Sequence, residues 1–171
     1  MSLTRGFSFL ELLVVVAILV ALAGVLVPVV NGELEASKKA TAQASVNRIA
    51  TALTEFIKDT SFAPTGEGGK RTYHVLHSDG AAPRGSSFES GEATTLERFL
   101  CRNELRVENW HGPYLRPVGS DPWGGRYVVN AHGFFTNDER VWILSAGPNG
   151  RLETSPGDSR PGGDDIGLFL E

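Results

Sequence analysis

The chain has 171 residues, a length that suits one folded domain with an appended element. Hydrophobic residues make up 41% and charged residues 21%, so the composition gives no reason to expect disorder. A formal net charge of −4 argues against a nucleic-acid-binding surface, and the single cysteine, Cys101, excludes an intrachain disulfide and a multi-cysteine zinc site.

The N-terminal segment combines a short basic leader with a long apolar run. Arg5 precedes the run, and Glu11 is the only charged side chain from Phe7 to Val30. A helix rises about 1.5 Å per residue, so about 20 apolar residues cross a hydrocarbon core of ~30 Å. Residues 7–30 therefore predict a membrane-spanning helix, and Arg5 predicts a cytoplasmic N-terminus with the rest of the chain exported.

Two other interpretations explain this segment less well. A secretory signal peptide has an apolar run of about 7–15 residues before a small-residue cleavage site, but this run is longer and Val29-Val30-Asn31-Gly32 is a poor site. A plain single-span anchor leaves Glu11 unexplained. A charge at membrane depth costs at least ~2.5 kcal/mol, so such residues are usually functional and paired.

The sequence Gly6-Phe7-Ser8-Phe9-Leu10-Glu11-Leu12, followed by an apolar helix, resembles the type III signal of type IV pilins and type II secretion pseudopilins. In that family a membrane prepilin peptidase cuts after the glycine and methylates the new amine. The resemblance implies a leader peptide over 1–6 and cleavage between Gly6 and Phe7. It also implies that Glu11 pairs with the Phe7 amine of a neighbouring subunit, because an apolar environment penalises unpaired charges.

The helix is predicted to continue over residues 31–60 as an amphipathic half. Neither proline nor glycine occurs from Glu33 to Thr60, and apolar residues recur there at steps of three and four, namely Val46, Ile49, Leu53, Phe56 and Ile57. Pro28 removes a backbone donor, which predicts a kink or melted stretch over residues 24–28.

Residues 61–171 are predicted to form the globular head. Residues 61–90 are rich in Gly, Pro and Ser and predict an irregular loop with a short strand over 71–77. Thr94 and Glu97 are spaced as a capping box, which predicts a short helix over 95–105. Cys101 lies within this helix and is expected to be a core residue rather than a reactive thiol.

Two segments rich in aromatic and β-branched residues, 126–130 and 141–145, predict an antiparallel hairpin. The expected fold class is therefore α+β, with the long helix packed on a small antiparallel sheet. The sequence Asp121-Pro122-Trp123-Gly124 predicts a turn before the first of these strands, with Trp123 as a core anchor.

Four segments of the head resemble, in order and approximate spacing, the C-terminal half of the major pseudopilin of type II secretion: residues 110–115, 121–127, 144–150 and 163–167. This resemblance implies a pilin-like lollipop with a C-terminal loop that binds calcium. Residues 61–109 do not match the pattern, so their role stays open.

The residues of the C-terminal loop suit a calcium ion, which takes six to eight oxygen ligands. The expected side-chain ligands are Asn149, Asp164 and Asp165, and the carbonyls of Ala146 and Arg151 are expected to complete the shell. The family usually has an aspartate where Asn149 stands, so a weaker site is expected. The alternative is a solvated loop without an ion.

Other chemistry has little support in the sequence. His74, His77 and Asp79 have a spacing that a metal site could use, but histidines in a polar loop are more often solvated. The sequence contains no metalloprotease helix motif, no nucleophile elbow and no phosphate-binding loop, so an enzyme is not expected.

The predicted function is a pseudopilin subunit of a type II secretion system. The resemblance implies a helical filament of copies of the chain, minor pseudopilins, a prepilin peptidase and an inner-membrane assembly platform as partners. The chain is expected to span the bacterial inner membrane once with its head in the periplasm. The alternatives are a subunit of a type IV pilus or competence filament, and a membrane-tethered binding domain that never polymerises.

Overall fold

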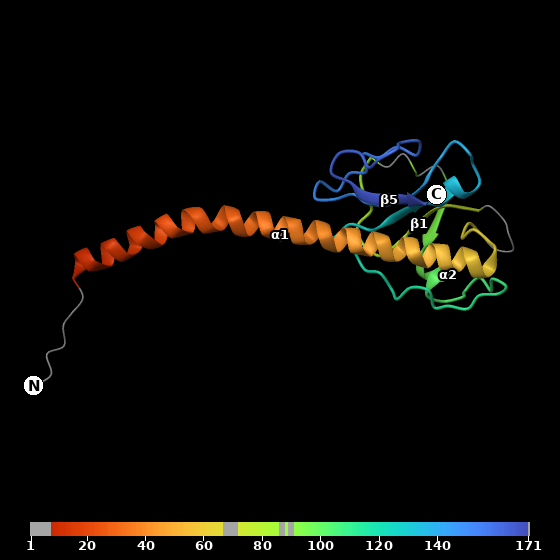
Figure 1. Cartoon of the computed structure of the whole chain (residues 1–171), viewed down its shortest axis with the longest axis horizontal. Helices are drawn as coiled ribbons and strands as arrows, with labels where there is room; N and C mark the ends of the chain where they lie inside the picture. The colour runs from red at the N-terminus through yellow and green to blue at the C-terminus, as the bar shows by residue number, and fades with distance from the viewer. Residues whose placement is uncertain (1–7, 67–71, 86–87, 89–90, 171) are drawn as a thin grey trace, which may run out of the picture. The chain divides into compact units, whose positions relative to one another are not determined.

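The computed structural model describes residues 8–66, 72–85, 88 and 91–170 (Figure 1). The elements are α1 (Phe9–Thr60), β1 (Tyr73–His77), β2 (Glu92–Thr95), α2 (Glu97–Leu100), β3 (Val128–Asn130), the 3₁₀ helix η2 (Ala131–Phe134), β4 (Val141–Ser145) and β5 (Ile166–Leu170). The chain divides into two compact units, Met1–Ser37 and Lys38–Glu171, each of which is described by itself.

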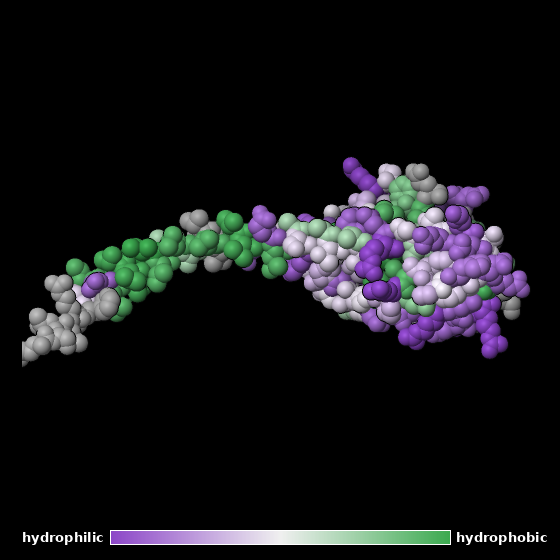
Figure 2. Space-filling model, turned by 60° about the horizontal axis from the view of Figure 1, so that its bottom comes forward, coloured by the Kyte–Doolittle hydropathy of each residue, from purple (hydrophilic) through white to green (hydrophobic). Residues whose placement is uncertain are grey.

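The first unit consists of the apolar part of α1. This part is helical without interruption through residues 24–28, so of the two predicted alternatives the melted stretch is wrong and the kink stays a prediction. A proline removes one hydrogen bond from a helix but does not have to end it. The helix is long and apolar enough to cross a membrane. Its described large apolar side chains are exposed, and Figure 2 shows hydrophobic surface along much of this part of the helix.

In the second unit, the last part of α1 packs on a sheet through one face. Val46, Ile49, Leu53 and Phe56 are fully buried, as their spacing predicts. Phe56 meets the rings of Phe99 and Tyr114 edge-to-face. Burying a side chain of this size stabilises the fold by about 1.5–3 kcal/mol, so this face holds the helix on the sheet.

The sheet has five strands in the order β2-β1-β3-β4-β5. The predicted hairpin is confirmed, with Val128 opposite Leu144 across the antiparallel β3–β4 pair. β1 and β5 also pair antiparallel with their neighbours, but β1 and β2 are parallel. The α+β class is therefore confirmed, with a mixed sheet in place of a purely antiparallel one.

Both faces of the sheet are covered, because side chains alternate along β4 and all are buried. Val141 and Ile143 join the core under α1, whereas Trp142 and Leu144 join a second cluster with Phe169. The loops after β4 lie on the side of the sheet away from α1 (Figure 1). Trp142 is the buried tryptophan, while Trp123 is only half-buried and outside both clusters, so the predicted core anchor at Trp123 is wrong.

The segment around α2 differs from the prediction. Thr94 lies in β2, and its hydroxyl accepts a hydrogen bond from Arg98 at 3.1 Å rather than capping a helix. The helix covers only Glu97–Leu100, and its cap residue Leu96 makes no side-chain cap bond. The predicted capping box is therefore wrong, and the predicted short helix exists but is shorter than residues 95–105. Cys101 is half-buried against the core, and burial raises the pKa of its thiol, as expected for a packing residue.

Candidate ion-binding site

The predicted ion-binding residues lie in the loop between β4 and β5, residues 146–165. The register of this antiparallel pair sets Ser145 opposite Ile166, so the two ends of the loop start side by side. Gly147 has a φ of +60°, and a Cβ there would overlap the carbonyl oxygen of Asp164. The loop can therefore close only with glycine at this position.

Asp165 has the most enclosed carboxylate of the loop, with 8% of the residue exposed. Its Oδ2 accepts hydrogen bonds from the backbone of Glu153 at 2.9 Å and Thr154 at 2.7 Å, and from the Thr154 hydroxyl at 2.6 Å. Burial raises the pKa of this carboxyl despite those bonds. Its Oδ1 is buried and, within the described part of the chain, has no hydrogen-bond partner.

Asp164 and Asn149 meet beside it. The Asp164 Oδ2 accepts from the Asn149 backbone at 3.1 Å, and Asp164 Oδ1 is a second buried oxygen without a partner among the described residues. The Asn149 Oδ1 accepts from the Arg151 backbone at 2.6 Å. Of the two residues expected to offer carbonyls, Arg151 thus enters the network through its N–H, and Ala146 lies buried directly after β4.

The two unpartnered carboxylate oxygens are the feature that fits a cation. A buried acceptor without a partner is costly, so native proteins leave few of them. Adjacent carboxylates also repel each other unless a positive charge lies between them. Oxygen-only ligands in a glycine-rich loop suit a hard ion such as calcium. Within the described ranges, however, no three His, Cys, Asp or Glu side chains are grouped to hold a metal, so backbone oxygens would have to contribute.

Glu153 belongs to the same network but was not predicted. Its Oε2 accepts from the Asn149 side-chain amide at 3.3 Å and from the Asp164 backbone at 3.4 Å. No pattern in the sequence signals this role, because Glu153 reaches Asp164 only after the loop has folded back on itself.

A segment of the unmatched region, residues 81–85, bridges this loop to the turn before β3; we call it the strap. The Ala81 N–H donates to the Gly124 carbonyl at 2.9 Å. Arg84 exchanges backbone bonds with Gly150 and Leu152, both at 2.9 Å, and its guanidinium donates to the Asn149 carbonyl at 3.1 Å. Part of the region whose role was open therefore supports the candidate site.

The turn over residues 121–124 is confirmed and is organised by Asp121, which is 4% exposed. Asp121 Oδ1 accepts from the backbone of Trp123 at 3.0 Å and Gly125 at 2.7 Å. Its Oδ2 accepts from the Ser145 hydroxyl at 2.5 Å. One carboxylate thus joins the turn to the end of β4, where the candidate loop begins.

The remaining predicted residues lie elsewhere. Glu11 is exposed in the first turn of α1, and Gly6 and Phe7 fall outside the described residues. The His74 ring stacks on His132 at a centroid distance of 4.6 Å, and His77 Nδ1 lies 3.0 Å from the Ser78 carbonyl. His74 and His77 therefore have other contacts, and with Asp79 they form no metal-binding group in the described structure.

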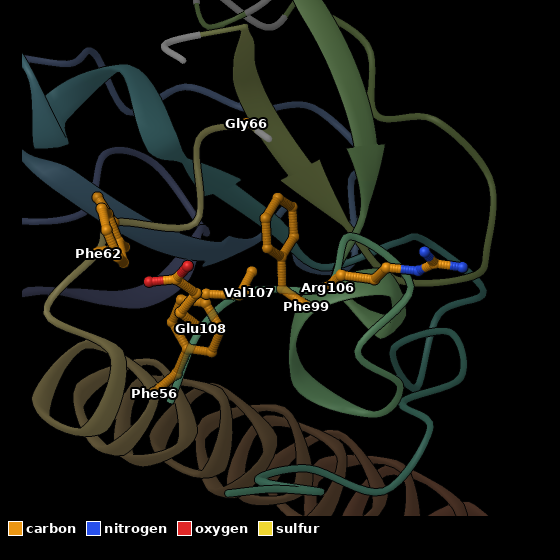
Figure 3. Close-up of a pocket in the computed structure, with 8 residues that line it drawn as sticks. Phe56, Phe62, Gly66, Phe99, Arg106, Val107 and Glu108 are labelled. Atoms are coloured by element: carbon orange, nitrogen blue, oxygen red, sulfur yellow. The ribbon is translucent and has the colours of Figure 1, made fainter. Parts of the chain in front are cut away.

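A pocket of about 330 Å³ opens near the end of α1 (Figure 3). The rings of Phe56, Phe62 and Phe99 contribute to it, and Phe62 is 42% exposed. Its other described lining residues come from 63–66 and 106–108. None of them belongs to residues 146–165, so the pocket is separate from the candidate ion site.

Comparison with known proteins gives a consistent picture. Residues 90–160 match the family model described as type II secretion system (T2SS), protein G. Type II secretion system core protein G of Escherichia coli strain K12 is 29% identical, covering 88% of this chain and 86% of its own length. The protein of that name from Klebsiella pneumoniae is 28% identical, covering 98% of this chain and 95% of its own length. The one from Dickeya chrysanthemi is 27% identical, covering 95% of this chain and 84% of its own length. No solved structure matches significantly.

Proposed function

We infer that the chain is a pseudopilin of the pilin-like superfamily, similar to the major pseudopilin of type II secretion systems, and that it polymerises into a periplasmic filament. The observation that carries this inference is the similarity to core protein G, which extends over nearly the whole chain. The match includes both the apolar helix and the head. A structural subunit, rather than an enzyme, agrees with the names of these relatives.

A type IV pilus or competence filament is the less favoured function. The matching family model and the relatives are all named for type II secretion. The resemblance to type IV pilins would imply a disulfide that closes the C-terminal loop, which one cysteine cannot form.

The exposed apolar side chains of α1 support assembly through this helix. Such a surface is stable only when it is covered, first by the inner membrane and then by the helices of neighbouring subunits in the filament. The proposed sequence of events is cleavage by a prepilin peptidase between Gly6 and Phe7, followed by pairing of Glu11 with the Phe7 amine of the next subunit. An inner-membrane platform and minor pseudopilins would complete the machinery.

The test is co-expression with a prepilin peptidase, with mass spectrometry of the N-terminus and electron microscopy of filaments. We expect a mature chain that begins with a methylated Phe7. Glu11→Ala should abolish filaments, while Glu33→Ala, an exposed carboxylate beyond the apolar run, should retain them. Filaments that persist in Glu11→Ala would reject the pairing, and a membrane-bound chain that never forms filaments would favour the tethered binding domain.

We also propose that the loop of residues 146–165 binds calcium through Asn149, Asp164 and Asp165. The support is the pair of buried carboxylate oxygens without partners. Calcium bound there would offset the repulsion between the adjacent carboxylates and hold the irregular loop in one conformation. Calorimetric titration of the chain with calcium, with magnesium as control, tests this proposal directly.

A further inference from the structure

The proposed calcium site has a charge deficit in the side chains predicted from the sequence. Asp164 and Asp165 are carboxylates, but Asn149 is a neutral amide. Calcium affinity rises with the number of charged ligands and with the rigidity of the site. A third negative charge close to the network would therefore change its affinity without being one of the predicted ligands.

Glu153 is placed to supply that charge. Its Oε2 accepts from the Asn149 amide at 3.3 Å and from the Asp164 backbone at 3.4 Å, and its own N–H donates to Asp165 at 2.9 Å. One residue thus contacts all three of the predicted side-chain ligands. A Cβ on Gly163 would overlap the Glu153 carboxylate, so the chain leaves room for this side chain with a glycine.

A second observation, independent of Glu153, points to a cation at this network. Asp165 is more than nine-tenths buried, and its Oδ1 has no hydrogen-bond partner among the described residues. The Asp164 Oδ1 is also buried and also has no hydrogen-bond partner among the described residues. Glu153 therefore adds a carboxylate to a network that already has two unsatisfied anionic oxygens, an arrangement that favours a divalent cation over a self-contained loop.

We propose that Glu153 is a positioning residue of the calcium site, supplying the negative charge that Asn149 lacks and orienting the Asn149 amide. It acts through its charge and its two hydrogen bonds rather than as a third carboxylate ligand, because no three His, Cys, Asp or Glu side chains of the described residues are grouped to hold a metal. This inference rests on the proposed calcium site.

The test is calcium titration of the full chain in detergent micelles by calorimetry, at low and high salt. Glu153→Gln keeps the shape and an acceptor oxygen but removes the charge, and should weaken calcium binding about tenfold, a change of about 1.4 kcal/mol. Asn149→Asp in the same chain restores the charge and should recover most of the affinity. Glu55→Gln, an exposed carboxylate on α1, is the matched control and should bind like the wild type.

The outcomes separate the two proposals. If the wild type binds no calcium, the calcium site itself is rejected, and the role of Glu153 with it. If the wild type binds calcium and Glu153→Gln binds equally well, only the role of Glu153 is rejected. If Glu153 were merely structural, Glu153→Gln would lower the stability of the calcium-free chain, and Asn149→Asp would not rescue binding. The loss caused by Glu153→Gln should also shrink at high salt, because salt screens an exposed charge.

Discussion

The Asp121 carboxylate offers the sharpest test of how the head is held together. It accepts three hydrogen bonds while 4% exposed, and its partner Ser145 is fully buried. Asp121→Ala removes the acceptor for all three donors at once. A hydrogen bond to a charged group contributes about 1.5–3 kcal/mol, and leaving a buried donor unsatisfied costs about 1–3 kcal/mol.

The expected loss is smaller than the sum of these figures. Trp123 and Gly125 are only half-buried, so water can satisfy part of the lost bonding. We therefore expect Asp121→Ala to lower the free energy of unfolding by about 3–5 kcal/mol. Asp121→Asn keeps an oxygen for the two backbone donors and offers an amide to Ser145, so it should cost only about 1 kcal/mol.

The assay is urea unfolding of residues 38–171, the unit that contains every buried core side chain of the described structure, at saturating calcium. With an m value of about 2 kcal/mol/M, the Asp121→Ala midpoint should fall by about 2 M. If the alanine variant does not fold, Ser145→Ala tests one bond alone and should cost about 1–2 kcal/mol. Equal losses for Asp121→Ala and Asp121→Asn would refute the reasoning, because they would show that hydrogen bonding is not what stabilises the turn.

Three further predictions concern the ion, the pH dependence and the core. A chelator should lower the melting temperature of residues 38–171, and calcium but not magnesium should restore it. At a hundredfold excess over Kd, bound calcium should stabilise this unit by about 2.7 kcal/mol. Asp165→Asn should remove this response, and an unchanged melting curve would reject the ion. Burial would raise the pKa of Glu139, but the hydrogen bonds from Asn130 and His132 hold it below its ordinary value. The stabilisation by Glu139 is therefore present above the carboxyl's unfolded pKa and lost as pH falls through the folded pKa. The difference in unfolding free energy between the wild type and Glu139→Gln, measured as a function of pH, should therefore close below about pH 4.5. A difference that is constant with pH would argue against this role of Glu139. Phe99 is fully buried, so Phe99→Ala should lower the free energy of unfolding, measured by chemical denaturation, by about 3–5 kcal/mol. Phe62 is exposed, so Phe62→Ala should lower it by less than about 1 kcal/mol. Similar losses for the two variants would contradict the assigned core.

The sequence predicted the elements that depend on local pattern. The spacing of Val46, Ile49 and Phe56 identified the buried face of α1, and the bounds predicted for β4 match the structure. β5 escaped prediction because Gly167 interrupts a short apolar run, and its strand conformation depends on pairing with β4. The helix cap predicted at Thr94 is wrong because of a tertiary contact too. Thr94 lies in β2, and the parallel pairing of β2 with β1 overrides the local capping signal.

The candidate site was predictable only in part. Asp164 and Asp165 were identified through the resemblance and the composition of the loop, and the structure brings both to Asn149 and its neighbours. Glu153 and the strap could not be predicted, because their contacts come from the return of the loop and from residues more than sixty positions away in the chain. Contacts of this kind are set by the tertiary fold rather than by sequence spacing.

The strap has a consequence for how this protein can diverge during evolution. Apart from the Arg84 guanidinium, its bonds to the turn and the loop join main-chain atoms. Main-chain bonds are independent of residue type except proline, so the strap can accumulate substitutions while its path is retained. Residues 81–85 can therefore lack a recognisable sequence pattern and still be required for the head. Their deletion should disorder the loop of residues 146–165, although none of the deleted residues belongs to that loop.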